Sequence, residues 1–171
     1  VAPGDPFSGF TGNDVGDADT GPNGLLDFPV IASVAAIGPG VVVVKGSGCA
    51  GCTVLAMAAA PDPSGHGEPN GSATATTVDE TGQWSLEMGL AADSYVTAVT
   101  IDGDGNMSES AKNVLGPSKL VVDRTDDDLV AACSTAANDC TLRGALTIVR
   151  SGDTIGFDAT TFPVGVATTI A

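Results

Sequence analysis

Basic side chains are scarce in this sequence. Its 171 residues include six Lys and Arg against 21 Asp and Glu, a formal net charge of −15. A protein that binds nucleic acid needs a basic face to displace counterions from phosphates, and six basic residues cannot build one. An anionic membrane surface would repel the chain as well. The charge therefore excludes nucleic acid as a partner and favours solubility and divalent cations.

Aromatic residues, histidines and long apolar runs are also rare. Aromatics make up 4% of the chain, so its core must be built from Val, Ile, Leu and Ala. No apolar run approaches the roughly 20 residues that cross a bilayer, which predicts no membrane insertion. His66 is the single histidine, and no nucleophile motif such as G-x-S-x-G is present. We therefore expect no catalytic site and no enzyme.

Cysteines are few but closely paired: Cys49 with Cys52, and Cys133 with Cys140. An even number at short spacings favours two local disulfides and an oxidising, extracellular or cell-surface location. One zinc site is the alternative, although the spacing fits neither a ribbon nor a finger. The opening VAPGDPF is typical of a mature or cut N-terminus rather than of a signal peptide.

Turn residues are abundant, with 23 Gly and 10 Pro. Between residues 28 and 116 they separate short apolar or alternating runs, which predict an antiparallel β-sandwich of immunoglobulin-like type. Trp84 is expected to pack between its two sheets. The predicted strands cover residues 28–37, 41–46, 52–60, 72–78, 83–89, 94–101 and 107–114. The segment before them, residues 1–27, is acidic and Gly-rich and could not fold alone.

The pattern changes over residues 117–171. A strand at 120–123 precedes an acidic turn, and then Leu142, Ala145, Leu146 and Val149 recur at helical spacing behind a capping Thr141. A further strand begins at TIGFD. The tail alternates Val164, Val166, Thr168 and Ile170 on one face, which predicts a strand over 164–171.

The stretch VVDRTDDDLVAACSTAANDCTLRGALTIVRSGDTIGFD, residues 121–158, resembles the CSLREA-type N-terminal cap of secreted right-handed parallel β-helix proteins. Cys140, Leu142, Arg143 and Ala145 stand where that family has them. Gly144 stands where the family usually has Glu, so any ion pair between that Glu and Arg143 is lost. The resemblance implies that Arg143 organises the cap through backbone or carboxylate hydrogen bonds.

GCAGCTV, DPSGHGE, TGQWSLE and DGDGNMSES occur in the order used by the immunoglobulin-like domains that accompany such β-helices. The opening NDVGDADTGPNGLLDFPV is similar to the loop by which those chains leave a β-helix. The resemblance implies a β-helix exit, a sandwich and a β-helix entrance, without the coils between. Either the chain is a piece of a longer array, or its cap docks on the exit of the next copy.

The acidic loop offers oxygen ligands for a hard cation. Asp14, Asp17, Asp19 and Asn23 are candidate calcium ligands, and a solvated acidic turn is the alternative. DGDGN at 102–106 starts like an EF-hand but lacks the glycine and glutamate that follow, so it is predicted to be a turn.

The sequence favours a structural role. We expect an extracellular filament or surface-array subunit that binds identical subunits head to tail, with the strand at 164–171 pairing between copies. The alternative is a binding module from a large adhesin that recognises a glycan or a cell surface.

Overall fold

The computed structural model describes residues 11–14, 21–134 and 136–170. The chain divides into two compact units, Val1–Gly116 and Pro117–Ala171. Most elements are β-strands, and the described residues contain one short α-helix and one 3-10 turn, η1 (Pro22–Leu25). No helix in this described part is long and apolar enough to cross a membrane. The chain is therefore mostly β, as the sequence predicts.

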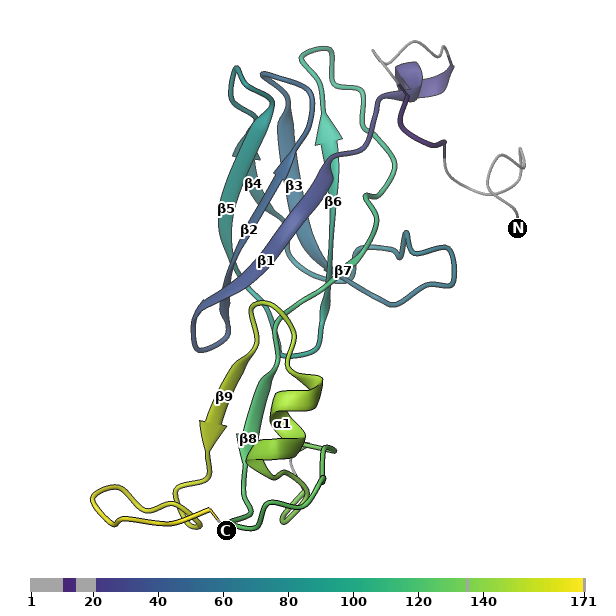
Figure 1. Cartoon of the computed structure of the whole chain (residues 1–171). Coiled ribbons are helices and arrows are strands. Elements are labelled where there is room, and N and C mark those ends of the chain that lie inside the picture. Colours follow the sequence, from purple (N-terminus) through teal and green to yellow (C-terminus); the bar gives the residue numbers. More distant parts are fainter. Residues whose placement is uncertain (1–10, 15–20, 135, 171) are drawn as a thin grey trace. The chain divides into compact units, whose positions relative to one another are not determined.

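The first unit contains two antiparallel sheets (Figure 1). In one, β2 lies between β1 and β5; in the other the order is β4-β3-β6-β7. Their bounds are β1 Val30–Gly38, β2 Val41–Ser47, β3 Thr53–Ala59, β4 Thr74–Thr77, β5 Gln83–Gly89, β6 Tyr95–Ile101 and β7 Val114–Leu115. Each predicted run from 28 to 101 thus contains a strand. The run predicted at 107–114 forms only the bridge of Met107 to Ile101 and the short β7.

Buried and exposed side chains alternate strictly along β5, and this alternation explains how the two sheets share one core. Along β5 the buried positions are Trp84, Leu86 and Met88, and the residues between them are exposed. These three side chains belong to the same apolar cluster as Val54 of β3 and Val96 of β6, which are fully buried. Full burial of each such side chain stabilises the fold by about 1.5–3 kcal/mol.

Gly46 of β2 is required by the tryptophan. A Cβ atom at residue 46 would lie 2.5 Å from the Cζ2 atom of Trp84 and 2.0 Å from the carbonyl oxygen of Val30. Neither neighbour can move freely, because the indole is 4% exposed and the carbonyl belongs to the paired strand β1. The indole ring therefore fits only over a residue without a side chain.

Many turns are organised by aspartate side chains. In Asp62, Asp79, Asp102, Asp126 and Asp158 the carboxylate accepts the backbone N–H two residues further on, at 2.8–3.2 Å. Such turns are typical of Asp, whose short side chain reaches its own backbone. Hydrogen bonds to the carboxylate lower the pKa of each of these side chains below its ordinary value. We call the five turns that these residues hold the aspartate turns.

The second unit is built around two parallel strands, β8 (Lys119–Val122) and β9 (Thr154–Phe157), with α1 (Leu142–Ile148) against β8 (Figure 1). Thr141 caps α1, accepting the N–H of Gly144 at 3.0 Å. Within the helical pattern, Ala145 is fully buried whereas Leu146 is 59% exposed. The small core is Leu120, Val122, Cys133, Cys140 and Ala145.

Candidate functional site

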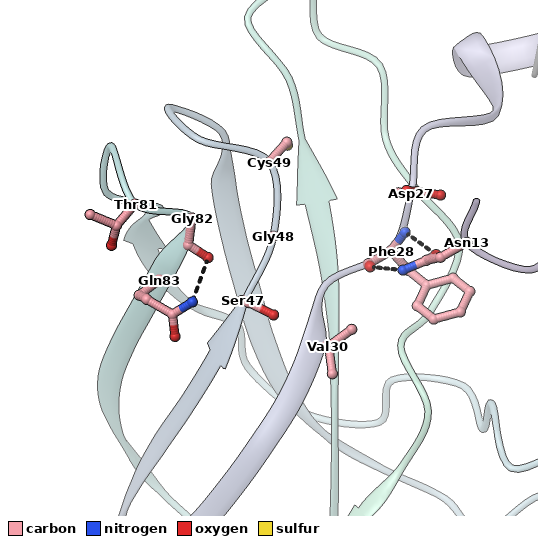
Figure 2. Close-up of a pocket in the computed structure, with 10 residues that line it drawn as sticks. All are labelled: Asn13, Asp27, Phe28, Val30, Ser47, Gly48, Cys49, Thr81, Gly82 and Gln83. Atoms are coloured by element: carbon pink, nitrogen blue, oxygen red, sulfur yellow. Dashed lines mark hydrogen bonds between the residues drawn. The ribbon is translucent and has the colours of Figure 1, made fainter. Parts of the chain in front are cut away.

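A hollow of about 470 Å³ lies at one end of the first unit (Figure 2). Thr81 and Gln83 line one side of it, Asn13 and Phe28 the other, and Ser47 lies between them. These residues come from the loop before β5 and its first residue, from the segment before β1 and from the end of β2. The hollow therefore combines hydroxyl and amide groups from segments far apart in the sequence.

Asn13 fixes one wall of the hollow. Its Nδ2 donates to the carbonyl of Phe28 at 2.7 Å, and its Oδ1 accepts the Phe28 N–H at 3.0 Å. This side chain thus pairs with the backbone as a neighbouring strand would. Thr11 adds a second tie, because its N–H donates to the carboxylate of Glu109. Residues 11–14 are therefore attached to the first unit.

Asp79 holds the opposite wall. Its carboxylate accepts the Thr81 hydroxyl at 2.7 Å and the N–H of Gln83 at 3.0 Å. The hydroxyl bond is the largest cause of the lowered pKa of Asp79. An ionised Asp79 therefore holds the Thr81 hydroxyl in place at the wall of the hollow.

Cys49 also lines this hollow, and it is joined to Cys52 in a disulfide. The second disulfide joins Cys133 to Cys140 in the other unit, and no described cysteine is free. Two disulfides are typical of proteins from oxidising compartments.

A second hollow, of about 510 Å³, follows the start of β1. Its walls are residues 28–31 on one side and residues 112–115, which include β7, on the other. Val30 and Leu115 line it and are 51% and 36% exposed. We call this feature the β1–β7 groove. Sequence reasoning missed it, and its only advance signal is the uncharged run FPVIASVAAI.

In the second unit Arg143 connects α1 to the acidic turn. Its Nε donates to the carbonyl of Asp127 at 2.9 Å, and its guanidinium pairs with the Asp127 carboxylate. This side-chain hydrogen bond lowers the pKa of Asp127 and raises the pKa of Arg143. Both groups are half-exposed, so the pair contributes little stability beyond orienting the turn.

Gly144 lies directly against the loop before α1. A Cβ atom there would lie 1.9 Å from the carbonyl oxygen of Val130 and 3.0 Å from the Cα of Ala131. A Glu at this position, as in the resembling family, would therefore need a different path for residues 130–131. This contact accounts for the glycine in physical terms.

The predicted self-association residues lie in an irregular tail. Val164 is 99% exposed and Val166 is 62% exposed, and Thr168 is exposed while Ile170 is partly buried. The expected strand over 164–171 is not formed in the described residues 164–170; a turn joins the N–H of Val166 to the carbonyl of Pro163 at 3.2 Å. The physical reason is that a strand needs a paired neighbour, and none lies alongside in this described stretch.

Of the predicted calcium ligands, Asp17 and Asp19 lie outside the described residues. Asp14 donates its N–H to the carboxylate of Asp27 at 3.2 Å, and Asn23 lies in η1. Within the described ranges no three His, Cys, Asp or Glu side chains gather as metal ligands would. The calcium site stays a prediction.

No model of a known protein family matches this chain, and no curated protein matches it.

Proposed function

We propose that the protein is a structural subunit of an extracellular filament or surface array, and that copies associate head to tail through strand or cap complementation. In this proposal the first unit is an immunoglobulin-like sandwich and the second is a β-helix-like cap. The observation that carries it is the parallel pair β8-β9, which has two strands among the described residues.

Parallel sheets occur almost only where further strands and covering layers bury them, and an isolated two-stranded ribbon is marginal in water. The N–H groups of Thr154 and Asp158 donate to Ser118 and Val122 on the β8 side. Since successive N–H groups of a strand alternate in direction, those of Ile155 and Phe157 point away from β8. They offer hydrogen bonds to an added strand.

Apolar side chains on the second unit support the same interpretation. Phe157 at the end of β9 is 50% exposed, and Leu146 and Val149 on α1 are 59% and 39% exposed. The core beneath them contains only small and medium side chains. The second unit, Pro117–Ala171, has 55 residues, and its apolar core is small for that length. A partner that covered these three side chains would enlarge that core.

A copy of the same chain is the proposed partner. A contact between two different surfaces of one chain is heterologous, and it propagates into a fibre when the rotation does not close. Strand addition supplies the backbone hydrogen bonds for such a contact. The disulfides, which suit an oxidising compartment, agree with assembly outside the cell.

The test compares wild type with Phe157→Lys, using sedimentation velocity and negative-stain microscopy. Lysine on an edge strand blocks further pairing. It also reduces the net negative charge, so lost assembly could not come from greater repulsion. Ala137→Lys, in an exposed loop of the same unit, is the matched control. We expect fibres from wild type and the control and monomers from Phe157→Lys; a wild type that stays monomeric would refute the proposal.

The hollow of Figure 2 favours one second candidate, a module that binds a glycan. Ser47, Thr81 and Gln83 offer hydroxyl and amide groups of the kind that bond sugar hydroxyls, beside the apolar Val30. Binding on a glycan array that is lost in Gln83→Ala and kept in Thr77→Ala would support this candidate. An array without binding would reject it.

A further inference from the structure

The outer edge of β1 has few of the features that prevent strand addition. β1 pairs with β2 on one side only and is the last strand of its sheet among the described residues. Its sequence, VIASVAAIG, contains neither a charged residue nor a proline. Soluble proteins protect their edge strands with charged residues such as Lys, with Pro or with β-bulges. Two irregularities, at Ala32 and Ile37, interrupt its register with β2 and leave the rest regular.

The β1–β7 groove adjoins this edge, and β7 on its opposite wall has only two residues. Its volume of about 510 Å³ is within the roughly 300–1,000 Å³ of ligand sites. Its lining is apolar apart from Lys112 and Asn113. The groove thus combines an open strand edge, exposed apolar side chains and one positive charge.

We propose that the groove binds residues 166–170 of a second copy, which add as a strand to the edge of β1. This inference rests on the proposed function and identifies one of its contact surfaces. The segment VATTI places Val166, Thr168 and Ile170 on one face when extended. Val166 is 62% exposed and has no strand beside it in the described residues.

Length and charge agree with this occupant. At roughly 3.3 Å per residue, five extended residues span about 17 Å, which is enough to cover the four-residue walls of the groove, about 13 Å long. The chain carries a net charge of −15, so two copies repel one another except where charge is absent or positive. Residues 166–170 carry no charge, and the one charged side chain on the groove is the positive Lys112. A positively charged groove also attracts a neighbouring chain that is negative overall.

The experiment uses the full chain and one charge on each surface. Val166→Asp places a carboxylate on the inward face of the tail, and Ala167→Asp places the same charge on the opposite face as its control. Val30→Glu places a carboxylate in the groove, and Thr77→Glu, on the exposed edge strand β4, is its control. All four sites are exposed or partly exposed, so the fold should survive, which circular dichroism checks.

We expect fibres from wild type and both controls, and monomers from Val166→Asp and Val30→Glu, measured by sedimentation velocity. Mixing these two variants should give dimers that do not grow further. The native tail of the Val30→Glu chain can bind the native groove of the Val166→Asp chain, and the other tail and the other groove both carry the added charge. Each variant remaining fully fibrous would overturn the groove while leaving assembly through β9 standing. A Val166→Asp chain that dimerises alone would instead indicate β1 pairing with β1. A monomeric wild type would overturn both the groove and the proposed function.

Discussion

Substituting Gly144 by alanine sets helix propensity against packing. Alanine is favoured over glycine by about 1 kcal/mol within a helix, so propensity alone predicts a more stable α1. In this fold the new Cβ atom would lie 1.9 Å from the Val130 carbonyl oxygen. That atom is backbone, and the Thr141 N–H donates to it at 3.0 Å. Overpacking costs about 1–3 kcal/mol, and an immobile neighbour indicates the upper end.

The expected net effect is a loss of about 2 kcal/mol, near 3 from the clash offset by 1 from propensity. Amide hydrogen exchange of residues 142–149, followed by mass spectrometry with the disulfides intact, measures opening of α1 locally. A loss of this size should speed exchange by about 30-fold, since 1.4 kcal/mol is tenfold. Thr147→Ala, exposed on the same helix, should change exchange little. Slower exchange in Gly144→Ala would show that the close approach to residue 130 is wrong.

Three further predictions concern the two units separately. Asp153→Asn should weaken the second unit by about 1.5–3 kcal/mol, because the 1%-exposed carboxylate accepts backbone N–H groups at 2.7 and 2.8 Å. Burial raises the pKa of Asp153, but these hydrogen bonds outweigh it and the pKa is lowered. The stabilisation of the second unit by Asp153 is therefore present above the unfolded pKa of about 3.9 and is lost as the pH falls through the folded pKa. Urea titrations at several acidic pH values would follow this loss. An Asp153→Asn variant whose stability changes with pH as the wild type's does would contradict this role. Gly46→Ala should destabilise the first unit by about 1–3 kcal/mol and alter the fluorescence of Trp84; an unchanged denaturation midpoint would count against the contact. Replacing Cys133 and Cys140 by serine should cost the second unit about 2–4 kcal/mol in hydrogen exchange, with an unaffected first unit as internal control.

Local patterns predicted the strands well where alternation is strong. The inward positions of β5, at Trp84, Leu86 and Met88, follow from period-two spacing alone. The cap of α1 at Thr141 was equally readable, because capping depends on neighbours three residues away. The buried face of the helix was predicted less well, since Leu146 fits the helical spacing yet is 59% exposed.

What the sequence could not predict depends on contacts between distant residues. Whether β1 is an edge strand is decided by its pairing, and no pattern within residues 30–38 encodes it. The Asn13 clamp on Phe28 joins residues fifteen apart, through a side chain that sequence reasoning treated as part of an acidic loop. The tail at 164–170 alternates as a strand does, but alternation cannot supply the neighbour that a strand needs.

The aspartate turns give the acidity of this chain an unexpected meaning. Part of the negative charge stabilises the protein's own turns, since each of those carboxylates accepts a backbone N–H and accepts it more strongly when it is ionised. Strong acid would weaken these turns in both units, although the backbone hydrogen bonds of the sheets do not themselves titrate. An environment that is merely mildly acidic would leave every one of these loops in place.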